Sequence, residues 1–201
     1  MTKEIPFLKE INERLRTIID QTALETIRWS GDLFEDLISC ILDVEIKYRG
    51  KALKFNRMKM ALDGAVINYN SIYLLGEDEI KYINMSSQKY STILYLSAYW
   101  DAYNWSYLDW YKLSDDEIRS LLLGVTGIGS KTIEMILLYT FQRPDIFPLE
   151  DLQLKNVMKK VYEIDDKEDL ESEMIYISDG WKPFRSTAVL YLLETAKTMK
   201  I

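Results

Sequence analysis

The segment "GVTGIGSKTIEMILLYTF" at residues 124–141 decides the fold of this chain. Three of the chain's eight glycines, Gly124, Gly127 and Gly129, lie within six residues there. The apolar run "IRSLLL" precedes them and the apolar run "IEMILLYTF" follows them. Glycine adopts backbone angles that are closed to other residues and lets a second backbone approach closely. The pattern therefore predicts a helix, a tight hairpin and a second helix.

Such a hairpin is also able to bind an anion. The amides in the first turn of a helix have no acceptor within that helix, and they lie at the positive end of its dipole. The spacing matches neither the Walker loop, G-x-x-x-x-G-K-[ST], nor a Rossmann fingerprint. A single backbone phosphate of a nucleic acid would fit. The alternative is a plain helix–helix turn with glycine caps, and the glycines alone do not decide between the two.

The rest of the chain has the composition of a folded helical protein. It has 201 residues, 48% of them hydrophobic and 28% charged, which is typical of one globular domain or two small lobes. "SDDEIRSLLL" opens with a capping box, in which Ser114 and Glu117 satisfy each other's backbone amides. Only 64–75 could contain strand or irregular structure. Helices are predicted at 7–20, 32–42, 86–100, 114–123, 131–141, 151–162 and 181–200, so the fold class is all-α.

Several classes of protein are excluded by the sequence. No stretch approaches eighteen consecutive apolar residues, and the first fifteen residues are charged and amphipathic. We therefore expect no membrane span and no secretory signal, and a cytoplasmic protein. Cys40, in "LISCIL", is expected to be a buried structural thiol. One cysteine and no histidine exclude a cysteine-ligated iron–sulfur cluster and argue against zinc. No metal and no organic cofactor are expected, although a structural cation at the hairpin carbonyls is compatible with the sequence.

Charge is unevenly distributed along the chain. The net charge of −7 argues against nucleic acid as a partner. Residues 46–60, however, carry six cations and no acid, whereas 163–173 carry seven acids and one lysine. The protein could thus present one basic face. The alternative is two solvated helix faces, which is what charge runs usually are.

Two further segments carry a family resemblance. Together with "GVTGIGSKT", the segments "RPDIFPLEDLQLKNV" (143–157) and "WKPFRSTAVLYLL" (181–193) resemble the helix-hairpin-helix DNA glycosylase superfamily. They are most similar to its 3-methyladenine DNA glycosylase II branch, and the resemblance is clearest over 114–195. It implies a two-lobed helical bundle with a single glycosylase domain at 1–201. In that domain the helix-hairpin-helix lies at about 114–142 and the catalytic-aspartate segment at 143–162.

The resemblance assigns the catalytic carboxylate to Asp151. Cleavage of an N-glycosidic bond passes through a sugar cation that resembles an oxocarbenium ion. A fixed carboxylate stabilises that cation and orients or deprotonates the attacking water. Glu150 is adjacent, but the alignment of "DLQL" favours Asp151. The alternative is that Asp151 only caps the helix that follows it.

Lys131 raises a second mechanism. Bifunctional members of the superfamily have a lysine two residues after the last hairpin glycine, where it attacks the sugar and forms a Schiff base. Lys131 occupies that position, and its amine would have to be neutral to react. The alternative is a solvated lysine that meets a phosphate.

Enzymes of the 3-methyladenine DNA glycosylase II branch commonly have aromatic residues at the position of Lys131 and at those of Met135 and Leu193. This chain lacks these aromatic residues. Seven aromatic residues at 99–111 could rebuild a stacking pocket, but core packing is favoured and no role is assigned to them.

The resemblance also implies the contacts with DNA. The damaged nucleotide would be flipped out of the duplex, and a plug from the segment 42–49 would fill the gap. That segment departs from the family's glutamine-rich form, so no plug residue is named. Phosphate contacts position such a protein without reading sequence. The candidate DNA-binding residues are Gly127, Ile128, Gly129, Ser130, Lys131 and Thr132 of the hairpin, with Lys47, Arg49 and Arg185.

Three functions are therefore considered. The first is a DNA glycosylase of base excision repair that hydrolyses the bond to a damaged, alkylated purine. The second is a bifunctional glycosylase and AP lyase that uses Lys131, for example on 8-oxoguanine. The third is a non-catalytic helix-hairpin-helix DNA-binding module, against which the matching Asp151 argues. We expect a monomer that acts on damaged double-stranded DNA, with no membrane association, beside the chromosome of a prokaryotic cell.

Overall fold

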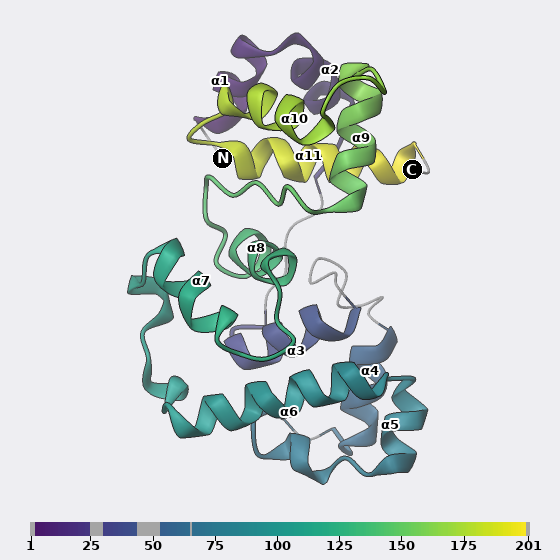
Figure 1. Ribbon diagram of the computed structural model, residues 1–201, viewed down its shortest axis with the longest axis vertical. Helices are drawn as coiled ribbons and strands as arrows, with labels where there is room; N and C mark the ends of the chain where they lie inside the picture. The colour runs from purple at the N-terminus through teal and green to yellow at the C-terminus, as the bar shows by residue number, and fades with distance from the viewer. Residues whose placement is uncertain (1–2, 25–29, 44–52, 65, 200–201) are drawn as a thin grey trace. The chain divides into compact units, whose positions relative to one another are not determined.

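The computed structural model describes residues 3–24, 30–43, 53–64 and 66–199 (Figure 1). Within these ranges the chain forms α-helices and short 3-10 helices and no strand. It divides into two compact units. One consists of Met1–Thr26 and Gln142–Ile201, and the other of Ile27–Phe141. The predicted all-α class is confirmed.

The first unit is built around its last helix. α11 is buried along most of its length and packs against α1, α2 and α9, while α10 packs on α9 (Figure 1). Trp181 and Leu192 are buried in this core. The helices of this unit are α1 (Glu4–Ile11), α2 (Glu13–Gln21), α9 (Leu152–Tyr162), α10 (Leu170–Asp179) and α11 (Arg185–Thr198).

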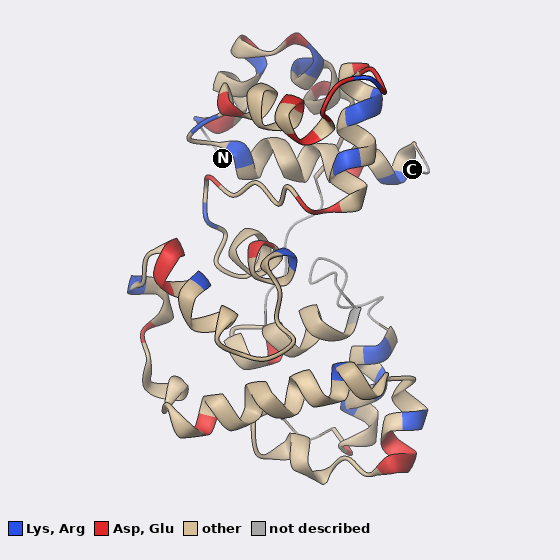
Figure 2. Ribbon diagram, viewed as in Figure 1, with Lys and Arg blue, Asp and Glu red and all other residues tan. Residues whose placement is uncertain are grey.

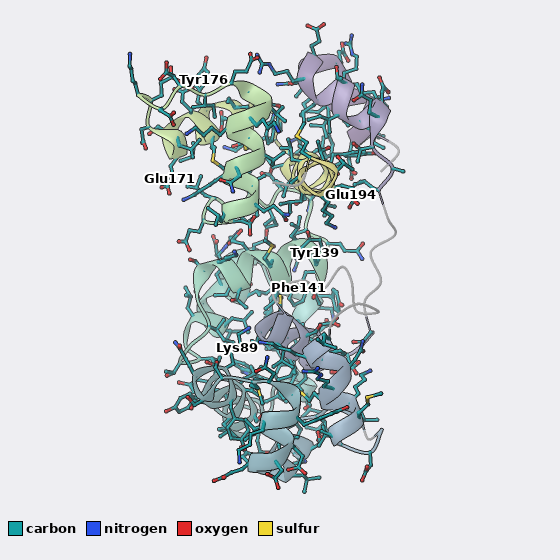
Figure 3. All side chains as sticks on the ribbon, turned by 90° about the vertical axis from the view of Figure 1, so that its right-hand side faces the viewer. Lys89, Tyr139, Phe141, Glu171, Tyr176 and Glu194 are labelled. Atoms are coloured by element: carbon teal, nitrogen blue, oxygen red, sulfur yellow. The ribbon has the colours of Figure 1, made fainter. Side chains whose placement is uncertain are left out.

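The second unit is built around α3 (Leu33–Asp43). This helix contacts α4, α6 and α8, and its Leu37 and Ile38 are fully buried. Lys89 of α6, labelled in Figure 3, donates from Nζ to the carbonyl oxygen of Leu42 at 2.6 Å, which ties α6 to the end of α3. The other helices are α4 (Leu53–Ala61), η2 (Ser71–Leu74), α5 (Glu77–Ile83), α6 (Ser87–Ala102), η3 (Trp105–Tyr107), η4 (Trp110–Lys112), α7 (Asp115–Leu123) and α8 (Ser130–Tyr139).

A local capping signal correctly predicted the start of α7. The capping box of α7 is confirmed, because the Glu117 amide donates to Ser114 Oγ (3.3 Å) and the Ser114 amide donates to Glu117 Oε2 (2.8 Å). The backbone amide of Ser114 holds the pKa of Glu117 below its usual range. At the start of α3, Asp32 Oδ1 accepts from the Glu35 amide at 2.9 Å. These sites need only residues three apart, so sequence is sufficient to find them.

The helix predicted at 7–20 is wrong as a single element. α1 ends at Ile11 and α2 begins at Glu13, because Asn12 has extended backbone angles (φ −145°, ψ 113°). Its side chain accepts from the Leu15 amide at 3.0 Å. Asparagine caps a helix better than it continues one, so the apolar periodicity runs through a break. In 66–75, where a strand was considered, the structure has irregular backbone followed by η2.

The three tryptophans of the aromatic segment 99–111 pack in the core, as favoured from sequence, whereas Tyr103, Tyr107 and Tyr111 are exposed. Trp100, Trp105 and Trp110 are each 4–5% exposed. The Trp105 and Trp110 rings meet edge to face at 5.1 Å, and those of Trp100 and Trp110 stack at 5.7 Å. The indole of Trp110 donates to the Trp105 carbonyl (3.1 Å) and that of Trp100 to Ser106 Oγ (2.9 Å). The cluster therefore satisfies its own polar atoms.

The structure also tests the sequence predictions about Cys40 and about a membrane span. Cys40 is a buried free thiol, and burial raises its pKa to about 12. It is therefore an inert packing residue. Over the described ranges, no helix combines the length and apolar character needed to cross a bilayer.

Candidate functional site

The hairpin between α7 and α8 depends on Gly127. This residue has φ +93°, a region that strains residues with a side chain. A Cβ atom built there would overlap Oγ1 of Thr92 on α6 and lie 3.0 Å from its Cβ and Cγ2. The hairpin backbone is thus packed directly on α6. Glycine is needed at 127 both for backbone conformation and for packing.

Gly129 is a glycine for neither of those reasons. It is the N-cap of α8 with φ −99° and ψ 170°, angles that any residue adopts. A Cβ atom at 129 would find no heavy atom within 4 Å. The space in front of this residue is open, and the first turn of α8 presents its amides there at the positive end of the helix dipole. The site can accept an anion close to the backbone.

The other predicted hairpin contacts differ in exposure. Ser130 is exposed, and Lys131 and Thr132 are partly exposed. Ile128 is only 5% exposed, so its side chain belongs to the core of the unit. Only the backbone of Ile128 could therefore contact a ligand.

A bidentate ion pair that was not predicted from the sequence joins α7 to α8. Arg119 of α7 donates from Nε to Oε1 of Glu134 on α8 at 2.7 Å, and from Nη2 to Oε2 at 3.3 Å. Its Nη1 also donates to Asp116 Oδ1 at 2.8 Å. This two-point pairing fixes the geometry of α7 relative to α8. The residues are fifteen apart across a turn, and no local spacing rule connects them.

Asp151 is positioned by the start of α9. Its Oδ1 accepts from the Leu154 amide at 2.8 Å, and its own amide donates to the Pro148 carbonyl at 2.9 Å. The side chain is buried, with the residue 5% exposed, whereas Glu150 is exposed. The N-cap interpretation is confirmed. A buried carboxylate held in one orientation is also what an electrostatic catalyst requires, so capping does not replace the catalytic prediction.

The loop that leads to Asp151 is fastened to the first turn of α11. Arg185 donates from Nε to Asp145 Oδ1 (2.7 Å) and from Nη2 to Oδ2 (2.9 Å). Ser186 Oγ donates to the Arg143 carbonyl (2.5 Å) and accepts from the Ile146 amide (2.8 Å). Arg185, predicted as a phosphate contact, is therefore engaged in a bidentate pair within its own unit.

The predicted residues fall into separate groups. The hairpin set, including Lys131, belongs to the unit Ile27–Phe141, whereas Asp151 and Arg185 belong to the other unit. Outside the described residues lie Lys47, Arg49 and all but the first two residues of the predicted plug segment 42–49.

Met135 and Leu193, where alkylpurine glycosylases commonly have aromatics, are both buried. Among the described residues, no cluster of three or more His, Cys, Asp or Glu side chains could hold a metal.

The acidic run 163–173 is partly neutralised by α9. Lys155 pairs with Glu171 at 2.5 Å, and Lys159 pairs with Asp166. Figure 2 shows basic residues along α9 and acidic residues in the turn that follows it. The side-chain amine of Lys159 holds the pKa of Asp166 below its usual range. In this region the charge run is thus an ion-paired surface of its own unit.

No family model matches the chain. Over 80 residues it is 36% identical to YfjP of Bacillus subtilis (strain 168), named provisionally as a DNA-3-methyladenine glycosylase. That match covers 40% of this chain and 28% of the relative, so the chain matches under a third of that protein's length.

Two solved structures resemble the chain over nearly its whole length. The DNA-3-methyladenine glycosidase of Bacillus halodurans has a TM-score of 0.77 at 20% identity, and the match covers 98% of this chain and 91% of the other. The Schizosaccharomyces pombe 3-methyladenine DNA glycosylase Mag1, solved with abasic DNA, has a TM-score of 0.78 at 20% identity and 97% coverage of both. The resemblance expected from the sequence is confirmed, and the chain has the fold of these glycosylases.

Proposed function

We propose that this chain, which has the fold of the DNA-3-methyladenine glycosylases, is a DNA N-glycosylase of base excision repair. Its substrate would be a damaged, alkylated purine in double-stranded DNA, and its reaction hydrolysis of the bond between base and deoxyribose. The names of the relative and of both structural neighbours support this activity class. The observation that carries the proposal is the buried Asp151 carboxylate, fixed at the start of α9.

The hairpin would bind the DNA backbone. Nothing within the described structure requires a glycine at 129. The missing side chain would instead serve a group outside the protein that must reach the backbone of α8. A phosphate suits the N-terminal amides and the dipole of the helix, and partly exposed Lys131 adds a positive charge beside it. This contact would position the enzyme without selecting a sequence.

Asp151 would act on the deoxyribose. As the base departs, positive charge develops on the sugar, and an ionised carboxylate beside it stabilises the oxocarbenium-like transition state. Its buried position makes that interaction stronger than it would be in water. The same carboxylate can orient or deprotonate the water that adds to the sugar. Because a stacked base cannot reach a buried acid, the nucleotide would have to leave the duplex first.

The proposal is tested by Asp151→Asn on a duplex that contains 7-methylguanine. Asparagine caps a helix as well as aspartate does, so the variant should fold and bind DNA as the native protein does. Base release, followed as heat-labile abasic sites, should fall at least about a hundredfold. Glu150→Gln, which changes the adjacent exposed acid, is the matched control and should retain activity. Undiminished base release by Asp151→Asn would overturn the proposal.

The same experiment addresses a non-catalytic DNA-binding role. A binding module would release no base in either form, while still binding the duplex through its hairpin. If the native chain releases the base and Asp151→Asn does not, while both bind DNA equally well, the non-catalytic role is excluded and the chain is an enzyme.

A further inference from the structure

The unit Ile27–Phe141 contains a pocket that the proposed glycosylase reaction does not use. Its volume is about 320 Å³, and it lies where α3 begins and the segment after α6 folds back. None of the residues that line it belongs to the hairpin, and Asp151 is not among them. Six aromatic side chains from three stretches of the chain contribute to its wall: Phe34, Tyr69, Trp100, Trp105, Trp110 and Tyr111.

The polar lining is acidic, and its side chains also include the hydroxyls of Tyr69, Ser106 and Tyr111 and the amide of Asn68. Asp32 and Asp109 both line the pocket, and no lysine or arginine is among its described lining residues. The indole donors of Trp100 and Trp110 are already used on Ser106 Oγ and the Trp105 carbonyl. The amide oxygen of Asn68 accepts from the backbone amides of two residues that follow it. What the pocket offers a ligand is therefore aromatic surface, hydroxyl groups that donate or accept, and negative charge.

One of the two carboxylates in this pocket, Asp109, belongs to an exposed ion pair. The ammonium of Lys112 lies 2.8 Å from Asp109 Oδ2 and holds the pKa of Asp109 below its usual range. Both members of this pair are well exposed, and pairs of that kind contribute little. A ligand cation can therefore share or displace Lys112. Asp32 Oδ1 accepts one hydrogen bond, from the Glu35 amide that it caps.

We propose that this pocket binds a compact organic cation, a guanidinium or alkylammonium group. Aromatic side chains attract such cations through their ring quadrupoles, and two carboxylates add Coulombic attraction. A phosphate or another nucleic-acid anion is repelled by the same groups. The cation is either a free small molecule or the basic side chain of a polypeptide, since both present the same head group. This site is independent of the glycosylase activity proposed above.

The test compares ethylguanidinium with ethylurea, which has nearly the same planar shape but no charge. Each is titrated, well below denaturing concentrations, into uniformly ¹⁵N-labelled protein while the indole N–H resonances are followed. Ethylguanidinium should shift the signals of Trp100, Trp105 and Trp110 in a saturable way, and ethylurea should not. Trp181, buried in the other unit, serves as an internal reference. Assignment uses single Trp→Phe variants.

Charge-removing variants complete the experiment. Asp109→Asn removes one carboxylate, and Asp32→Ser removes the other while keeping a helix cap. Each should weaken ethylguanidinium binding about two- to fivefold, with base release unchanged. Equal responses to ethylurea, or binding insensitive to both variants, would overturn the proposal. N-acetylarginine amide, titrated alongside, identifies the source. Tighter binding than ethylguanidinium supports a polypeptide partner, and weaker binding a free cation.

Discussion

Gly127 and Thr92 are in such close contact that the hairpin cannot carry a side chain at 127. A Cβ atom there would overlap Thr92 Oγ1, in a backbone conformation (φ +93°) that already disfavours one. We predict that Gly127→Ala lowers the free energy of unfolding by about 2–4 kcal/mol, the sum of backbone strain and overpacking. Urea denaturation followed by circular dichroism measures this change. A loss below about 0.5 kcal/mol would mean that the hairpin does not rest on α6 as described.

Gly129 provides the matched opposite case. Its backbone angles are ordinary and its Cβ direction is open. Gly129→Ser should therefore leave the free energy of unfolding unchanged or raise it by a few tenths of a kcal/mol, because serine is a good N-cap. Affinity for a duplex with an abasic-site analogue should nevertheless fall about tenfold, since the hydroxymethyl group would occupy the position proposed for the phosphate. Fluorescence anisotropy measures that affinity. Native affinity in Gly129→Ser would argue that no phosphate approaches this residue.

Variants of the Arg185–Asp145 pair distinguish two roles for Arg185, which are holding the loop before Asp151 and contacting a DNA phosphate. If the pair holds the loop that leads to Asp151, then Arg185→Lys and Asp145→Asn should have the same effect. Lysine loses the two-point pairing and asparagine loses the charge. We predict that both variants lose about 1–2 kcal/mol of stability. Both should slow base release, with DNA affinity within about twofold of native. A lower DNA affinity in Arg185→Lys alone would instead favour the phosphate contact predicted from the sequence.

Asp151 combines a structural and a proposed chemical role, and substitutions can separate them. Asp151→Asn retains a capping side chain, whereas Asp151→Ala loses it and should cost about 1 kcal/mol of stability. Base release should be lost equally in both, because neither provides a carboxylate. Thermal unfolding measures the stability of each variant, and a 7-methylguanine release assay measures its activity. If activity instead followed stability, with asparagine nearly native and alanine impaired, Asp151 would be a cap alone.

The sequence predicted best what depends on neighbouring residues. Ser114 and Asp151 were recognisable as caps because a cap needs only the next three residues. The hairpin was recognisable because its glycines are clustered. The distinction between Gly127 and Gly129 was not visible, since it depends on where α6 lies. Nor were the Arg119–Glu134 and Asp145–Arg185 pairs, which join residues brought together only by folding. The break at Asn12 was missed because an apolar stripe continues across a capped interruption.

Lys131 decides between hydrolysis and lyase chemistry. In the proposed mechanism it binds phosphate at the start of α8, so Lys131→Gln should weaken DNA binding a few-fold. The slope of log affinity against log salt should also become shallower by about one. Base release at saturating enzyme should persist, and borohydride should trap no protein on duplexes that contain 7-methylguanine, 8-oxoguanine or an abasic site. A trapped species that disappears in Lys131→Ala would instead establish a Schiff base with the sugar. Lys131 would then be the nucleophile, and the chain a bifunctional glycosylase rather than a hydrolase of alkylated purines.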